Sequence, residues 1–158
     1  MIDPQSVSAE SPAPAPAPGP FIPGRTKFES ELVVRPDDID MYRHVHASRY
    51  FDYVLAARCD QMARCYGMSM EEFARAGLGW YTRTSHFEYK RPLVLGETIV
   101  VRTWIEEFAP DGVRVEFEIR KKANGKLASD GWCHYTLIDL QTGRATRIPP
   151  SILAKYAI

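Results

Sequence analysis

Hydrophobic and polar residues alternate along several short segments of the chain. Residues 113–121 place Val, Val, Phe and Ile on one face and charged side chains on the other, and residues 27–35 alternate in a similar way. A period of two residues predicts strands of a sheet with one solvated face. Asp-Gly at 111–112 and Asn-Gly at 124–125 are signals for hairpin turns. We expect further strands at 81–91, 98–107 and 132–139.

A helical period replaces this alternation over residues 48–66. Apolar side chains recur there every three or four residues and predict a helix with one buried face, formed by Phe51, Leu55, Cys59, Met62 and Tyr66, with Val54 and Ala63 beside them. A second, short helix is expected at 69–77, with Ser69 as its N-cap. One strand, one long helix and a run of four strands predict an α+β fold. In that fold a curled antiparallel sheet wraps around the single central helix.

The first 24 residues differ from the rest in composition. Residues 1–24 are rich in Pro and Ala and offer almost no side chains for a core. Such a segment buries too little apolar surface to offset its ordering entropy, so we expect a disordered or polyproline-like tail. The folded domain is expected to occupy residues 25–158.

Charge and composition argue against several classes of function. The chain carries 20 Lys or Arg and 20 Asp or Glu, and a formal net charge of zero is unlike a non-specific nucleic-acid binder. No apolar run is long enough to span a membrane, and the N-terminus shows no secretory pattern. The three cysteines, Cys59, Cys65 and Cys133, form no short-spaced pair, which is typical of reduced thiols. We therefore expect a cytoplasmic protein.

Ionisable residues crowd the stretch just ahead of the long helix. Asp40 lies there, with His44 between it and the predicted helix start. A helix start exposes backbone N–H groups and carries partial positive charge, so it can polarise a carbonyl oxygen. A nearby carboxylate can attack the carbonyl carbon or activate a water molecule. The stretch can therefore form an acyl-transfer site without Ser or Cys, although Asp40 could equally be a turn-forming residue.

Three separated segments resemble one family. VRPDDIDMYRHVHASRY (34–50) resembles the pattern V-R-x-x-D-x-D-x-x-G-H-V-N-N-x-x-Y of the 4-hydroxybenzoyl-CoA thioesterase family of hotdog-fold proteins. EYKRPLVLGE (88–97) and IDLQTGR (138–144) resemble its Y-x-R-P-x-x-x-G-D and V-D-x-x-T-G-R segments. The resemblance spans about residues 27 to 150 and is strongest to the bacterial long-chain acyl-CoA thioesterases. The positions that match the first motif in register are Asp38, Asp40, His44, Val45 and Tyr50.

The resemblance implies a hotdog thioesterase that hydrolyses an acyl-CoA, with fatty acyl groups favoured, without a metal or organic cofactor. By the same resemblance Asp40 is the nucleophile or general base, and the amide of Ala47 polarises the thioester carbonyl. The remaining implied site residues are His44 in the pocket, Tyr50 near the substrate, and Lys90 and Arg91 for the CoA phosphates. His46, where the chain departs from the family, is a further candidate for contact with the substrate. Homodimers or homotetramers, as dimers of dimers, are implied as well. An open sheet edge in a single copy also favours pairing.

The chain departs from the family pattern at two places. Arg43 stands where Gly is common, and His46 and Ala47 replace two Asn residues. Asn is a good helix N-cap and His is a poorer one, so the helix could begin at Ser48 instead. His46 then either caps the helix or reaches the substrate, and the sequence leaves both open.

Two alternatives remain at this stage. A metal-dependent enzyme could use Asp38, Asp40, His44 and His46 as ligands, although their spacing matches no known metal motif. A non-catalytic acyl-binding protein could also use the same fold. The identity of the acyl group, aromatic or aliphatic, and the carrier, CoA or acyl carrier protein, are open too.

Overall fold

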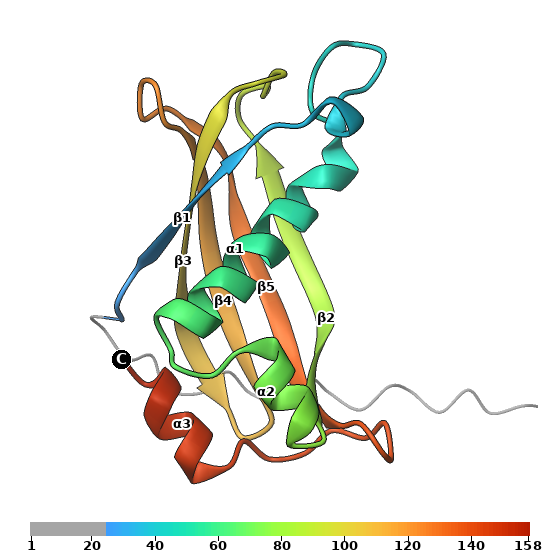
Figure 1. Cartoon of the computed structure of the whole chain (residues 1–158), viewed down its shortest axis with the longest axis vertical. Coiled ribbons are helices and arrows are strands. Elements are labelled where there is room, and N and C mark those ends of the chain that lie inside the picture. Colours follow the sequence, from blue (N-terminus) through green and yellow to red (C-terminus); the bar gives the residue numbers. More distant parts are fainter. Residues whose placement is uncertain (1–24) are drawn as a thin grey trace, which may run out of the picture.

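The computed structural model describes residues 25–158, and it has the predicted α+β hotdog architecture (Figure 1). A five-stranded antiparallel sheet in the order β1-β3-β4-β5-β2 curls around one long helix, α1. The strands are β1 (Phe28–Val33), β2 (Leu78–Tyr89), β3 (Thr98–Ala109), β4 (Gly112–Lys121) and β5 (Leu127–Asp139). The helices are α1 (Tyr50–Arg64), α2 (Met70–Arg75) and α3 (Pro150–Tyr156). The predicted tail, residues 1–24, lies outside the described residues.

The core lies between α1 and the concave face of the sheet. In β3 and β4 the alternation seen in the sequence is the alternation of burial, because every second side chain points at the helix. The largest apolar side chains on this inner face are fully buried, among them Ile99, Val101, Ile105, Phe117 and Ile119. Burial of this size is the main force that holds sheet and helix together.

The buried stripe of α1 differs from the prediction. Phe51 and Leu55 are only partly buried and Cys59 is exposed, whereas the fully buried positions of the helix include Arg58 and Gln61. Gln61 donates hydrogen bonds to the backbone oxygens of Phe28 and Val101. Polar side chains that are hydrogen-bonded in this way can occupy a core. The prediction counted only apolar residues as buried, so it placed the buried face of the helix about one residue away from its true position.

Two further elements differ from the prediction. Strand β5 begins at Leu127, five residues before the predicted start, because small residues such as Ala128 and Ser129 are fully buried in the sheet. The C-terminal helix α3 was missed. It begins with Pro150 in the first turn, and its Tyr156 ring stacks on the Tyr66 ring with centroids 4.5 Å apart.

The two ends of the sheet carry different structures. The loop 36–49 between β1 and α1 lies at the end where β2 finishes, whereas α2 and α3 lie at the opposite end (Figure 1). Strand β2 forms one edge of the sheet, and most of its residues are partly or fully exposed. Within residues 25–158, no helix is long and apolar enough to cross a membrane.

Candidate active site

A tight turn shapes the loop in front of α1. The Asp40 N–H donates to the His44 carbonyl at 2.9 Å, and the Arg43 N–H donates to the Asp40 carbonyl at 3.0 Å. Ile39 and Val45 form an isolated bridge just outside this turn. Asp40 and His44 lie at the two ends of this turn, and the hydrogen bonds of the turn hold the backbone of both residues in place.

Arg43 occupies an unusual backbone conformation at the tip of this turn. Its φ is +63°, the left-handed region that favours glycine. The resembling family often has Gly at this position, so the departure noted in the sequence falls where a side chain is least favourable. A non-glycine residue there costs about 1–2 kcal/mol.

Arg43→Gly is expected to stabilise the protein. The gain should be about 0.5–1 kcal/mol, because relief of the left-handed conformation is partly offset by the greater freedom of glycine in the unfolded chain. Urea denaturation measures the change. Arg43→Ala keeps the Cβ and serves as the control, with no comparable gain. A loss of stability in Arg43→Gly would contradict the backbone argument.

Asp38 anchors the loop to the helix. Its carboxylate is 1% exposed and accepts a hydrogen bond from the Tyr53 hydroxyl of α1 at 2.7 Å. The Arg35 N–H also donates to it at 3.2 Å, and the Arg35 guanidinium lies 3.6 Å away. Burial acts to raise the pKa of Asp38, but the bonds from Tyr53 and Arg35 outweigh it and hold the pKa below its usual value. Asp38 therefore has a structural role beside the site.

Tyr53→Phe is expected to cost about 1.5–3 kcal/mol of stability at pH 7, since it removes a hydrogen bond to a buried charge. The folded-state pKa of Asp38 is lowered, so its contribution is present above the unfolded pKa of about 3.9 and is lost as pH falls through the folded pKa. The stability difference between wild type and Tyr53→Phe should thus shrink below about pH 4. Denaturation curves at pH 7, 5, 4 and 3 measure this, and a pH-independent difference would contradict it.

Asp40 lies at the mouth of a cavity of about 380 Å³. It is half-buried, and its Oδ1 accepts a hydrogen bond from the Tyr42 N–H at 2.8 Å. Its Oδ2 has no hydrogen-bond donor, and the carboxylate has no ion pair, among residues 25–158. The carboxylate is therefore positioned through one oxygen while the other remains available for reaction. The cavity is lined by Asp40, Tyr42, His44, Val45, Ala47, Tyr50, Tyr89, Lys90, Arg91 and Pro92.

The α-helix begins two residues after the predicted start, at Tyr50 instead of Ser48. A 3-10 turn over Ala47–Arg49 leads directly into α1, and His46 is its N-cap. The His46 Nδ1 accepts a hydrogen bond from the Ser48 N–H at 3.1 Å. His46 thus caps the helix and does not line the cavity. The Ala47 N–H has no hydrogen-bond acceptor among the described residues, and Ala47 does line the cavity.

The end of β2 closes the other side of the cavity. The Tyr89 hydroxyl donates to the Ala47 carbonyl at 3.2 Å, and its ring meets the Tyr50 ring edge-on with centroids 4.9 Å apart. Lys90 is exposed and pairs with Glu88 at 2.7 Å, while the Arg91 guanidinium donates to the Leu127 carbonyl at 2.8 Å. Tyr50 itself is only 3% exposed, so it forms the floor of the cavity.

Six of the seven predicted site residues line this one cavity, and His46 is the exception. The four remaining lining residues, Tyr42, Val45, Tyr89 and Pro92, were not predicted as site residues, although Val45 matches the first motif. Tyr89 could have been found, because it is the Tyr of the segment that resembles Y-x-R-P.

The alternative metal ligand set is not brought together. Asp38 points at Tyr53 and His46 caps the helix, away from the cavity that Asp40 and His44 share. In the part of the chain that the structure describes, no three His, Cys, Asp or Glu side chains are grouped so as to hold a metal ion.

Comparison with known proteins agrees with the fold and identifies the family. The sequence profile of the thioesterase-like superfamily matches residues 34–156, which is most of the chain. The chain belongs to this superfamily. It is a thioester hydrolase by family, and the loop, α1 and the end of β2 all lie inside the matched region.

Two similar proteins are thioesterases, and a third was solved with CoA bound. The long-chain acyl-CoA thioesterase FadM of Escherichia coli (strain K12) is 20% identical over 127 residues, which cover 80% of this chain and 95% of FadM. The DHNA-CoA thioesterase of Staphylococcus aureus has the same fold, with a TM-score of 0.78, 21% identity, and coverage of 83% of this chain and 89% of that one. A second S. aureus protein, solved in complex with CoA, has a TM-score of 0.72, 21% identity, and coverage of 84% and 83%.

Proposed function

We propose that this protein hydrolyses acyl-CoA thioesters to a free acid and CoA, with Asp40 as nucleophile or general base. One observation carries the proposal. A half-buried carboxylate and an N–H at a helix start line the same cavity, and within residues 25–158 one carboxylate oxygen and this N–H have no hydrogen-bond partner. These are the two groups that acyl transfer requires, one to deliver a nucleophile and one to stabilise the oxyanion.

The mechanism follows from this pair. The thioester oxygen accepts a hydrogen bond from the Ala47 N–H, which favours the charge that develops on it. Asp40 Oδ2 either attacks the carbonyl carbon or removes a proton from a water molecule that attacks it. The C–S bond breaks, and CoA leaves as the thiol after it gains a proton. In the first route a water molecule then hydrolyses the mixed anhydride, and both routes consume one water molecule.

Lys90 and Arg91 are proposed to bind the phosphates of CoA. Both are exposed at the rim of the cavity, where a long anionic substrate would leave the site. Arg91 presents a guanidinium suited to phosphate oxygens. Lys90 would first have to exchange its contact with Glu88, so Arg91 is the stronger candidate. His44 lines the cavity next to Asp40 and is proposed to orient the substrate.

The protein is proposed to act as a homodimer or a homotetramer. Strand β2 is an edge strand, hydrogen-bonded to a neighbour on one side only. Two apolar side chains of α1, Phe51 and Leu55, pack against the core but are only partly buried. A second copy that pairs along β2 would satisfy this edge. Light scattering should give two or four times the chain mass of 17.9 kDa. A monomer at micromolar concentration would contradict this proposal and leave the catalytic one intact.

The unpaired cysteines favour a cytoplasmic location.

A panel of acyl-CoA esters tests the proposed function. Thiol release is measured for short, medium and long straight chains and for benzoyl and phenylacetyl groups, with a chelator present. We expect turnover of at least one class, and fatty acyl chains are favoured by the similarity to FadM. Folded protein that hydrolyses no ester would contradict the proposal and favour a non-catalytic acyl-binding role.

A further inference from the structure

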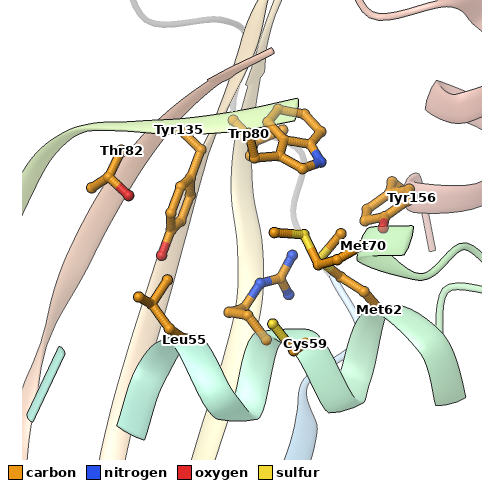
Figure 2. Close-up of a pocket in the computed structure, with 10 residues that line it drawn as sticks. Leu55, Cys59, Met62, Met70, Trp80, Thr82, Tyr135 and Tyr156 are labelled. Atoms are coloured by element: carbon orange, nitrogen blue, oxygen red, sulfur yellow. The ribbon is translucent and has the colours of Figure 1, made fainter. Parts of the chain in front are cut away.

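A second, smaller cavity lies inside the fold, further along α1. It has a volume of about 60 Å³, is partly open to solvent, and is lined by side chains of α1, α2, β2, β4, β5 and α3. Figure 2 shows the Trp80 and Tyr156 rings, Met62 and Met70 around it, with Leu55 and Cys59 on the helix below. Most of the wall is apolar. This volume holds a few water molecules or the end of a small organic chain.

Arg58 is the charged group of this wall. It is 7% exposed, and its Nη1 donates to the Thr103 hydroxyl at 3.2 Å. Its guanidinium also lies over the Tyr66 ring, 5.2 Å from the centroid. No carboxylate of residues 25–158 comes within 4 Å of it, whereas the neighbouring Arg64 on the solvent side of α1 pairs with Asp60. An arginine buried without a counter-ion is costly, and proteins seldom keep one without a partner.

Tyr135 adds a second polar group to the same wall. It is 8% exposed, and its buried hydroxyl has no hydrogen-bond partner of ordinary geometry within the described part of the chain. The Cys133 thiol beside it is a weak partner. Figure 2 shows the ring reaching from β5 toward Leu55 with its hydroxyl oxygen leading. Burial raises the pKa of the Tyr135 hydroxyl, so it stays protonated and can only donate to an anion.

We propose that this cavity receives the distal end of the acyl group, and that Arg58 and the Tyr135 hydroxyl bind a carboxylate there. The preferred substrates would then be CoA monothioesters of dicarboxylic acids. Two buried donors and an unbalanced positive charge suit a carboxylate, while the apolar wall suits the methylene chain that leads to it.

The position of the cavity sets the length of the chain. Arg58 follows Tyr50, the floor of the active-site cavity, by eight residues of α1, or about 12 Å along the helix axis. A diacid of medium length suits this separation, because a long side chain such as that of Arg58 leans toward the N-terminus of its helix and shortens the distance to be spanned. This inference rests on the proposed thioesterase function, because it names the substrate class of that site.

The test compares suberoyl-CoA with octanoyl-CoA, which differ only in the terminal carboxylate. Wild type should prefer suberoyl-CoA in kcat/KM by roughly 10-fold or more. Arg58→Met should lower kcat/KM for suberoyl-CoA by roughly 10- to 100-fold and leave octanoyl-CoA within a few-fold. Arg64→Met removes the same charge from the solvent side of the helix and should leave the preference unchanged.

A binding measurement provides a readout besides turnover. Free suberate should raise the Tm of wild type and of Arg64→Met, but not that of Arg58→Met. If Arg58→Met does not fold, Tyr135→Phe takes its place, with a smaller loss of preference for suberoyl-CoA. The kcat/KM ratio of wild type for suberoyl-CoA over octanoyl-CoA tests the proposal whether or not the variants fold.

Each outcome separates the two proposals. Hydrolysis of octanoyl-CoA at least as fast as suberoyl-CoA by wild type, with a ratio unmoved by Arg58→Met, would overturn this inference and leave the thioesterase function standing. Absence of turnover on any ester would overturn the thioesterase function. In that case suberate binding that depends on Arg58 still supports the carboxylate site, and its absence overturns that as well.

Discussion

Asp40→Asn is expected to lower kcat by roughly 10²- to 10⁴-fold and to leave the affinity for CoA unchanged. The amide is a poor nucleophile and cannot accept the proton of a water molecule, so both proposed routes lose their reacting group. Binding should survive because Asn has nearly the same shape. Its side-chain oxygen can still accept the Tyr42 N–H that now holds Asp40 Oδ1. Steady-state kinetics and calorimetric titration with CoA measure the two quantities.

Asp37→Asn is the matched control for this variant. Asp37 belongs to the same loop, but its carboxylate is exposed and does not line the cavity. The substitution removes the same charge at nearly the same place, so it should change kcat by less than a few-fold. An Asp40→Asn enzyme that keeps more than about a tenth of wild-type kcat would contradict the catalytic role of Asp40.

Gly131→Ala is expected to have the largest effect on stability, about 3 kcal/mol or more. A Cβ at this position would lie 1.8 Å from the His86 carbonyl oxygen of β2 and 2.9 Å from the Phe117 ring. Strands β5 and β2 would have to separate around Phe87 and Gly131, which are paired in the register. Because Tyr89 at the end of β2 touches the helix start, hydrolysis should fall along with stability.

Gly143→Ala separates this clash from the ordinary cost of replacing a glycine. A Cβ at Gly143 would meet nothing within 4 Å, although its φ of +69° disfavours a side chain. We expect a loss of only about 1–2 kcal/mol there. Thermal and urea denaturation compare the two variants, and similar losses would show that the close approach to His86 does not control the pairing of β5 with β2.

The sheet was predictable where it has one solvated face. Residues 113–121 alternate in the sequence because only one side of β4 meets α1, so burial and sequence share the same period. The first residues of β5 gave no such signal, since small side chains such as Ala128 and Ser129 are buried there. Helix α3 was missed because two buried residues, Ile152 and Tyr156, are too few to establish a helical period.

The candidate site was predictable as a motif but not as a geometry. Asp40, His44 and Ala47 lie within eight consecutive residues, so a resemblance could find them together. Tyr89, which closes the other side of the cavity, lies at the end of β2, more than 40 residues further along the chain. Only the fold brings Tyr89 to Ala47. Arg58 and Tyr135, which both line the second cavity, lie further apart still in the sequence. The apolar period of the helix does not include Arg58, so the sequence pattern carried no sign of a buried charge there.

Hydrolysis of an acyl-CoA in water labelled with ¹⁸O tests the central claim most directly. Chelator-treated wild type is given excess substrate, and the released thiol and the mass of the acid are measured together. The account predicts many turnovers, one CoA for each molecule of acid, and an acid carboxylate that carries the label. An acid without label, or no release of CoA by the folded protein, would contradict a thioester hydrolase built on Asp40.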